Sequence, residues 1–337
     1  MNESLEKINE IVDKYVDQRF EEFKNINYFD AMFSEKGVPT TEKLMKSFDE
    51  VVNSKAEKLN SRGKVGDIIR YFHKSIAYAK RGDGMYSPYE YFEYLKTDKE
   101  AFKKFYTNRL ARSDWFNEKK GANRHFLYEG YVPDFIYLIG LTTAMFATQV
   151  SLFKPTLAKN LIKKYANEFN TIFDPFSGYS GRLLGALALR KTYIGQDVND
   201  ATVKEANEIL SFLEKNVQEL NTLKAIKNSS VSVKDSFTEK GTYDCLLTCP
   251  PYSNEFGKQI EVWKNSKGET IECKFDINNV IKTCLENYNC KKYIFVVDGS
   301  KTDYDEYVAE YIVNKGYMHA NNNGINENSE KVIVIEK

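Results

Sequence analysis

The chain has 337 residues, a length that predicts about two domains. Its 48 Lys and Arg residues equal its 48 Asp and Glu residues, so the net charge does not predict a polyanion-binding protein, and any nucleic-acid contact must depend on local charge. The five cysteines form no Cys-x-x-Cys pair and no spacing with histidine, which argues against a zinc site or a disulfide framework and predicts a reducing, cytoplasmic location. The charged N-terminus has no apolar run, so no signal peptide is expected.

Residues 1–149 are predicted to form a mainly helical domain. Apolar residues recur at helical spacing from Leu5 to Val16 and from Ile68 to Ala77. Residues 135–153 carry no charge, but threonine, serine and glutamine interrupt the run, so a buried helix is favoured over a membrane span.

Charge is distributed unevenly within this domain. Residues 1–51 hold 12 acidic and 7 basic side chains, whereas residues 96–125 hold 9 basic and 4 acidic ones. Basic and aromatic side chains interleave over residues 62–125, a pattern that suits phosphate contact and base stacking. Solvated lysines over a Tyr-rich helical core explain the pattern equally well.

From about residue 150 the pattern changes to alternating strands and helices, which predicts an α/β domain over residues 150–337 with a doubly wound, mostly parallel sheet. The last segment has an Asn-Asn-Asn-Gly turn before an apolar run, which predicts a hairpin that closes the sheet with an antiparallel strand. The predicted strands are Thr171–Phe173, Thr192–Gln196, Tyr243–Thr248, Tyr293–Val297 and Val332–Ile335, and the predicted helices cover 183–190, 200–217, 276–287 and 304–314.

The segment from Thr171 to Ala186 reads as a strand, a glycine-bearing turn and the start of a helix. Gly178 and Gly181 let the backbone approach a ligand without an intervening Cβ, and ligands of open α/β sheets bind beyond the carboxyl ends of the strands. Asp197 ends the next predicted strand, where a carboxylate can accept from both hydroxyls of a ribose. A helix-capping aspartate is the alternative interpretation.

A second motif lies at residues 245–254, Cys-Leu-Leu-Thr-Cys-Pro-Pro-Tyr-Ser-Asn. An apolar strand runs directly into two prolines, which fix φ and remove two backbone donors, and Tyr252 follows with a face on which a flat ring can stack. The arrangement is suited to holding a flat ring that bears an amino group.

Together these two motifs resemble the cofactor and catalytic loops of the S-adenosylmethionine-dependent amino-methyltransferases that act on adenine N6 or cytosine N4 in DNA. The resemblance covers about residues 150–337. It implies a seven-stranded, Rossmann-like methyltransferase sheet and S-adenosyl-L-methionine as cofactor, with no metal. The last predicted strand ends near the end of the given sequence, so the helical region 1–149 becomes the candidate DNA-recognition region, with recognition by a partner as the alternative.

The resemblance also assigns residue roles, all of them expectations. Cofactor contacts fall on the segment before the loop, on the loop itself, and on the acids that end the second and third strands. The loop departs from the family's Gly-x-Gly by having Ser180 in place of the second glycine. The expected cofactor-binding residues are Phe153, Lys154, Pro155, Thr156, Asp174, Pro175, Phe176, Gly178, Gly181, Asp197 and Asp235, and the expected catalytic residues are Cys249, Pro250, Pro251 and Tyr252.

In this family the residue before the prolines and the first proline's carbonyl accept the two amino hydrogens of the base, while the aromatic ring stacks on it. By this mapping Pro250 supplies the carbonyl and Tyr252 the ring. The base must first leave the duplex. The first acceptor is Asp, Asn or Ser in the family but Cys249 here, and a thiol accepts weakly, so Thr248 or a backbone carbonyl is a possible replacement.

The leading hypothesis is therefore a DNA amino-methyltransferase that flips its target base, with double-stranded DNA and a companion restriction endonuclease as partners and no membrane association. An RNA or protein-amide methyltransferase is the second hypothesis, because related Pro-Pro-Tyr loops occur in both. A third is a nucleic-acid-binding protein whose methyltransferase domain has lost activity, with Cys249 and Ser180 as the changed positions.

Overall fold

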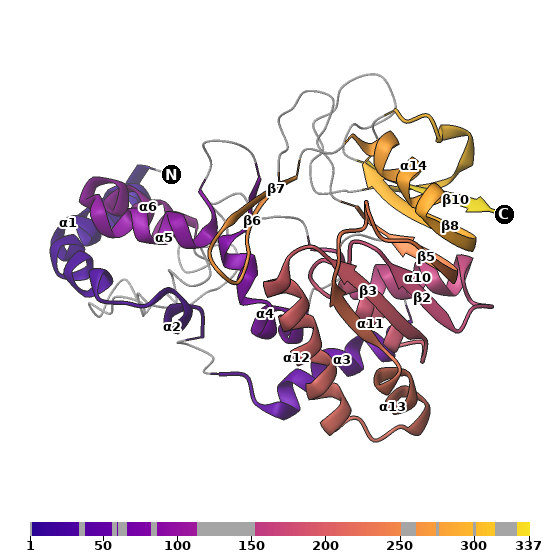
Figure 1. The fold of residues 1–337 in the computed structure, drawn as a ribbon. Coiled ribbons are helices and arrows are strands. Elements are labelled where there is room, and N and C mark those ends of the chain that lie inside the picture. Colours follow the sequence, from indigo (N-terminus) through magenta and orange to yellow (C-terminus); the bar gives the residue numbers. More distant parts are fainter. Residues whose placement is uncertain are drawn as a thin grey trace. The chain divides into compact units, whose positions relative to one another are not determined.

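The computed structural model describes residues 2–33, 38–55, 59, 66–81, 86–112, 152–250, 261–273, 276–298, 301–313 and 329–337. Two compact units make up the chain, one from Met1–Pro39 and Gly84–Gln149 and the other from Thr40–Asp83 and Val150–Lys337. The expected division after residue 149 coincides with the boundary between Gln149 and Val150, but residues 40–83, expected in the first domain, belong to the second unit. Figure 1 shows the elements in chain order.

The first unit is helical in its described residues. Phe23 packs edge-on against Phe92, with ring centroids 4.8 Å apart, and stacks on Phe102 at 5.1 Å. These three rings come from three different helices, which therefore join through an aromatic core. The helices are α1 (Asn2–Lys24), α2 (Tyr28–Phe33), α5 (Pro88–Thr97) and α6 (Lys99–Arg112).

The second unit is built on a seven-stranded sheet of order β4-β3-β2-β5-β8-β10-β9. Neighbouring strands from β4 to β8 pair in parallel, and β10 runs antiparallel to both β8 and β9. The predicted doubly wound, mostly parallel sheet is confirmed, as is its antiparallel closing strand. The strands are β2 (Thr171–Asp174), β3 (Thr192–Asp197), β4 (Ser230–Val233), β5 (Gly241–Thr248), β8 (Tyr288–Asp298), β9 (Val308–Val313) and β10 (Ser329–Glu336).

One predicted helix is wrong. The described part of this range, residues 304–313, contains a short 3₁₀ helix, η4 (Asp305–Tyr307), followed by strand β9. The side chain of Ile312 is fully buried whereas that of its neighbour Tyr311 is 52% exposed, which is the two-residue alternation of an edge strand. β-Branched Val308, Ile312 and Val313 favour this extended conformation. The Asn-Asn-Asn-Gly turn expected between β9 and β10 lies outside the described residues.

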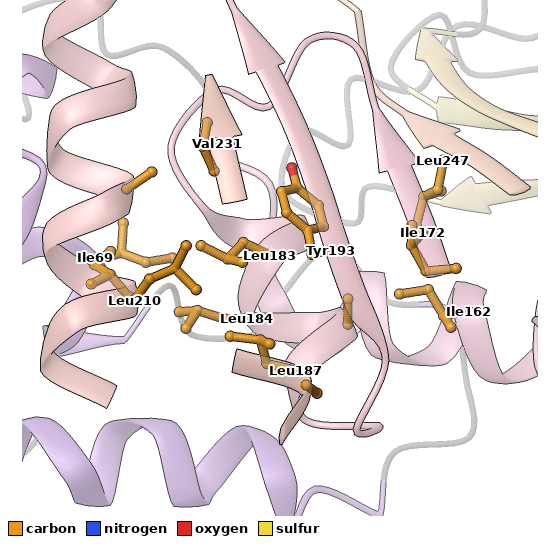
Figure 2. Close-up of a cluster of buried hydrophobic side chains, with 14 of the residues drawn as sticks. Ile69, Ile162, Ile172, Leu183, Leu184, Leu187, Tyr193, Leu210, Val231 and Leu247 are labelled. Atoms are coloured by element: carbon orange, nitrogen blue, oxygen red, sulfur yellow. The ribbon is translucent and has the colours of Figure 1, made fainter. Parts of the chain in front are cut away.

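Alternate residues of a strand point to opposite sides, so the sheet has two apolar faces, and helices cover both of them. One face packs against α10 (Pro155–Tyr165), α11 (Gly181–Leu187), α12 (Asp200–Asn216) and α13 (Leu220–Lys227), and the other against α14 (Ile277–Asn287). Figure 2 shows part of the first core, where Leu183, Leu184 and Leu187 of α11 lie near Tyr193 of β3 and Leu210 of α12.

Residues 40–83 join this first core. They form α3 (Thr41–Val52), α4 (Asp67–Phe72), the 3₁₀ helix η1 (Lys74–Tyr78) and β1 (Lys80–Arg81). Lys159 of α10 donates from Nζ to the carbonyls of Val51 and Val52 at 2.9 and 2.6 Å, which satisfies carbonyls at the C-terminal end of α3. The residues that this segment buries in the first core are Leu44, Phe48, Ile68 and Ile69.

A small antiparallel sheet of order β1-β6-β7 joins residues 80–81 to two strands that follow the predicted catalytic segment, and it was not expected from the sequence. Strands β6 (Glu261–Lys264) and β7 (Thr270–Cys273) form its hairpin. Ser266 in the hairpin donates from its backbone N–H to Asp200 Oδ1 at 2.8 Å, so the hairpin is held at the start of α12. None of the helices within the described ranges is both long and apolar enough to cross a membrane.

Candidate functional site

The carboxyl ends of β2, β3 and β5 lie side by side, because β2 pairs in parallel with both other strands. This edge brings together three of the predicted site regions: the loop that begins at Asp174, the Asp197 carboxylate and the Cys249-Pro250 pair. The carboxyl edge of an open parallel sheet is where such folds bind ligands.

Asp174 ends β2 and is fully buried. Its Oδ2 accepts from Arg182 Nε and from the Tyr193 hydroxyl, both at 2.6 Å, and its Oδ1 accepts from Thr248 Oγ1 at 2.7 Å. The Phe176 N–H adds a fourth donor at 3.2 Å. A carboxylate has about four acceptor positions, so Asp174 is saturated by the protein itself. Its carboxylate ties β2, β3, β5 and α11 together and leaves no acceptor position for a ligand.

Arg182, in the first turn of α11, is the ionic partner of Asp174 and is itself buried. Burial acts to lower the pKa of the guanidinium, but the charge of Asp174, with further contributions from Tyr193 and Cys249, raises that pKa above its ordinary value. The guanidinium also donates to the Phe176 carbonyl and lies over the Phe153 ring, 5.0 Å from its centroid. Arg182 thus fixes the loop from within.

The loop between β2 and α11 makes a tight, left-handed turn. Gly178 has φ 54° and Ser180 has φ 61°, both in the region that favours glycine. A Cβ on Gly181 would lie 2.0 Å from the Phe153 carbonyl oxygen, so only glycine allows the loop to pack against that segment. Gly181 is thus required by its contact with the Phe153 segment and Gly178 by its positive φ, while their predicted approach to a ligand stays a prediction. Ser180, at the position where the family has its second glycine, is left-handed as well.

Asp197 ends β3 and is partly exposed. Its Oδ2 accepts from the Gly178 N–H and its Oδ1 from the Asn199 N–H, both at 2.9 Å. The N-cap of α12 is Asn199, whose side chain accepts from the Ala201 N–H, so the alternative role of helix cap does not fall to Asp197. Burial raises the pKa of the Asp197 carboxyl. About two acceptor positions of this carboxylate stay available for a ligand.

Two residues that the sequence did not single out lie at this edge. Val198 follows Asp197 and is 53% exposed, although valine is usually buried. The Ser177 hydroxyl is buried in the loop and has no hydrogen-bond partner among the described residues. The sequence shows that Val198 follows the acid directly, but its exposure is visible only in the structure. An unsatisfied buried hydroxyl is visible only in the structure.

The segment before the loop lies against it. The Phe153 carbonyl and ring contact Gly181 and Arg182 as described above, and Lys154 is the N-cap of α10, with its pKa lowered by burial. Pro155 is buried at the first position of that helix, where its missing N–H costs no hydrogen bond. Thr156 is half-buried beside it. The structure places this segment at the loop as expected, while its contact with a cofactor stays a prediction.

The remaining predicted cofactor residues occupy two positions. Pro175 and Phe176 lie in the loop, where the Pro175 carbonyl accepts from the Ser236 hydroxyl and the Phe176 ring lies 5.9 Å from that of Phe237. Asp235 is exposed beyond the end of β4, and its Oδ1 accepts from the Phe237 N–H at 2.9 Å. The turn that holds Asp235 is therefore joined to the loop, and its role toward an adenine amino group stays a prediction.

The catalytic motif is only partly within the described residues. Cys249 follows β5, is half-buried and packs against the main core cluster, and Pro250 is buried. Pro251 and Tyr252 lie outside the described residues. The Thr248 hydroxyl is fully buried and donates to Asp174, which corrects the expectation that it replaces Cys249 as an amino acceptor. The backbone carbonyls of the motif are the acceptors that remain beside the weak Cys249 thiol.

The candidate DNA-recognition region is represented by the described helices of the first unit. Lys99 lies 2.5 Å from Asp17 and Lys103 lies 2.6 Å from Asp13, so basic α6 pairs with acidic α1. A hydrogen bond and charge attraction from Asp13 raise the pKa of Lys103. For these two lysines the uneven charge of the sequence reflects helix pairing inside the unit, which favours the interpretation as a solvated face. Residues 113–125 of the basic stretch lie outside the described residues.

No protein-family model and no curated protein matches the sequence. Solved structures similar to this chain include a proposed methyltransferase from Escherichia coli, at 14% identity and TM-score 0.34, covering 53% of this chain and 83% of that one. A proposed RNA methyltransferase from Pyrococcus horikoshii has 11% identity and TM-score 0.36, with 54% and 82% covered. An rRNA methylase from Streptococcus thermophilus has 11% identity and TM-score 0.29, with 56% and 99% covered.

Proposed function

We propose that this chain is an S-adenosylmethionine-dependent methyltransferase that acts on an exocyclic amino group of a base in DNA. The observation that carries the proposal is the hydrogen bond of 2.9 Å from the Gly178 N–H to Asp197, which joins the glycine loop after β2 to the acid that ends β3. This pairing sets a carboxylate with open acceptor positions beside a backbone turn, the combination that a nucleoside linked to a polar tail requires.

The described residues fit the proposed cofactor. The two remaining acceptor positions of Asp197 match the two hydroxyls of a ribose, and exposed Val198 offers an apolar surface for the adenine ring. The buried Ser177 hydroxyl, which has no hydrogen-bond partner among the described residues, is a polar group that the loop itself leaves unsatisfied. When bound, the cofactor supplies a methyl group on a positively charged sulfur. The chain's own contribution is to bind and orient, which can supply a large share of a transfer rate.

The acceptor end of the site follows β5. An amino nitrogen delocalised into a base ring is a weak nucleophile, and carbonyls around Pro250 that accept its hydrogens would return its lone pair to the nitrogen. The carbonyls around Pro250 would orient this nitrogen for the methyl group that a bound cofactor would supply, and the nitrogen would give up one proton to water. Tyr252 would stack on the flipped base.

The form of the motif, Thr-Cys-Pro-Pro-Tyr at residues 248–252, is the reason to prefer DNA as substrate. With that preference come double-stranded DNA as partner, a cytoplasmic location and a companion restriction endonuclease that cuts DNA lacking the methyl group. RNA and protein-amide substrates are the outcomes that would replace it.

The test is incubation of the full chain with tritiated S-adenosylmethionine and separate pools of unmethylated DNA, RNA and protein, followed by mass spectrometry of the labelled pool. Label in DNA as methyladenine or methylcytosine is the expected result and names the base. Label in RNA or protein would overturn the DNA assignment, and absence of cofactor binding by calorimetry would overturn the whole proposal. Tyr252→Ala is expected to bind cofactor but to lose methyl transfer.

A further inference from the structure

Ser180 holds a backbone conformation that serine rarely adopts. It has φ 61° and ψ 9° at the N-cap of α11, where its carbonyl accepts the Leu184 N–H at 3.0 Å. In this left-handed region the Cβ of an L-residue crowds its own backbone, so a residue other than glycine stays there only when its surroundings hold it. A contact from outside the loop must therefore hold Ser180 in this conformation.

His73 makes that contact from the end of α4. Its Nε2 lies 2.7 Å from Ser180 Oγ, and its ring lies edge-on to that of Tyr179, with centroids 5.5 Å apart and planes at 90°. The side chains of His73 and Ser180 are both buried, at 1% and 2% exposure. One imidazole therefore contacts two consecutive residues of the loop from a segment more than a hundred residues away in sequence.

The other side of the imidazole is fixed as well. His73 Nδ1 lies 3.1 Å from Glu205 Oε2 of α12, and Glu205 also accepts from the N–H of Ser75 at 2.8 Å and from its hydroxyl. A carboxylate only accepts, so Nδ1 carries the hydrogen that it donates to Glu205. In the neutral ring Nε2 is then the acceptor, and the Ser180 hydroxyl donates to it. The carboxylate thereby sets both the orientation of the ring and its tautomer.

A serine, a histidine and a glutamate in this order also occur in hydrolases, where the serine is a nucleophile. Burial excludes that role, because a nucleophile must be reached by its substrate and the Ser180 side chain is 2% exposed. The Phe153 carbonyl also occupies the space beside Gly181, the next residue. The network is closed to a substrate and acts on the loop instead.

We propose that His73 is a positioning residue for the cofactor loop: held by Glu205, it keeps Ser180 in the left-handed conformation and so replaces the glycine that the turn would otherwise need. The proposal rests on the proposed function, since it concerns the loop expected to bind S-adenosylmethionine. It gives residues 66–78 a role in cofactor binding without any contact to the cofactor.

The sharpest test compares two changes at Ser180. Ser180→Ala removes the hydroxyl and keeps the Cβ, whereas Ser180→Gly removes both. Ser180→Gly is expected to bind S-adenosylmethionine about tenfold more tightly than Ser180→Ala in calorimetry, a ratio that corresponds to about 1.4 kcal/mol. Neither change opens a large cavity, so both variants should fold. Equal affinities, or weaker binding by the glycine variant, would overturn the proposal.

A second variant tests His73 itself. His73→Phe keeps a ring against Tyr179 but removes both polar atoms. In the chain with the native Ser180, this change is expected to weaken cofactor binding about tenfold, which corresponds to about 1.4 kcal/mol. In the Ser180→Gly chain the same change should weaken binding less than about twofold, because glycine needs no support there. An equal loss in both chains would mean that His73 serves only packing. Ser211→Ala, on the outer face of α12, is the control for loss of a serine hydroxyl.

Thermal unfolding without cofactor separates this inference from the function on which it rests. The four chains compared are the wild type, His73→Phe, Ser180→Gly and the variant with both changes. A larger fall in Tm for His73→Phe in the serine chain than in the glycine chain is expected even if the wild type binds no S-adenosylmethionine. That result with no binding would sink the proposed function and leave the support of Ser180 intact. Equal falls in Tm would sink the support of Ser180, whatever the affinity data show.

Discussion

The ends of two neighbouring strands carry the same residue type and use it in opposite ways. Asp174 ends β2, is fully buried, and accepts from four donors of the protein. Asp197 ends β3, is partly exposed, and accepts from two backbone N–H groups. The first carboxylate is saturated by the fold and the second has acceptor positions left. The number of internal donors, rather than the residue type or the place at the sheet edge, separates a carboxylate that the fold saturates from one that keeps acceptor positions.

The largest expected effect tests the structural side of this comparison. Asp174→Asn leaves the buried Arg182 without its charge partner and should lower the free energy of unfolding by about 3–5 kcal/mol. Chemical denaturation measures the loss. Asp244→Asn breaks the exposed pair with Lys291 and serves as the control, with a change of about 1 kcal/mol or less. A tolerated Asp174→Asn variant would remove the distinction between the two acids.

The second prediction tests the ligand side. Asp197→Ala should weaken S-adenosylmethionine binding about a hundredfold, the scale of hydrogen bonds to a charged group, because the acceptors for the ribose hydroxyls are lost. Calorimetry gives the affinity, and circular dichroism checks that the chain stays folded. If Asp197→Ala binds as the wild type does, the carboxylate serves only the Gly178 turn.

The third prediction concerns pH. Burial raises the pKa of Asp197, so its carboxyl takes up a proton at a higher pH than an ordinary aspartate, whose pKa is 3.8. Cofactor affinity should fall by up to about tenfold per pH unit below that raised pKa, since the protonated carboxyl accepts fewer hydrogen bonds.

Folding responds to the same proton in the opposite direction. Between the raised pKa and 3.8 the folded state binds more protons at Asp197 than the unfolded chain, so this group alone adds stability as pH falls. Calorimetric titrations with cofactor from about pH 7 to about pH 4, on the wild type and on Asp197→Asn, separate the contribution of Asp197 from that of the other titrating groups. The same pH profile in both proteins would contradict the assignment.

The smallest expected effect tests the apolar neighbour of Asp197. Val198→Thr keeps the shape of the side chain and makes it polar, so cofactor binding should weaken about fivefold, the scale of roughly 1 kcal/mol of lost apolar contact. Stability should hardly change, because Val198 is 53% exposed. Leu220→Gln, at an exposed position of 78%, is the matched control. No change in affinity would place the adenine elsewhere on this edge.

Much of the second unit was predictable because its signals are local. The five predicted strands appear within a few residues of their expected positions, since each is a short apolar run that contains β-branched or aromatic residues. The helix expected at 304–314 was wrong because a short apolar run fits both the helical and the strand period. Pairing with β10 made residues 308–313 a strand.

The site was predictable as a set of motifs but not as a set of contacts. The sequence by itself determined where the turns lie, because Gly178 and Gly181 are the residues that a left-handed conformation and a close approach demand. It also determined which acids end strands β2 and β3. It could not separate the roles of those acids, since the donors to Asp174 come from β3, β5 and α11.

Only the tertiary structure decided the rest. It moved residues 40–83 into the second unit, committed Thr248 to Asp174, and brought His73 to both Ser180 and Glu205 across more than a hundred residues of chain. The physical reason is the distance along the sequence over which each property is determined. Backbone conformation and hydrophobic period are set by neighbours in sequence, whereas the saturation of a buried polar group is set by whichever segments the fold packs around it.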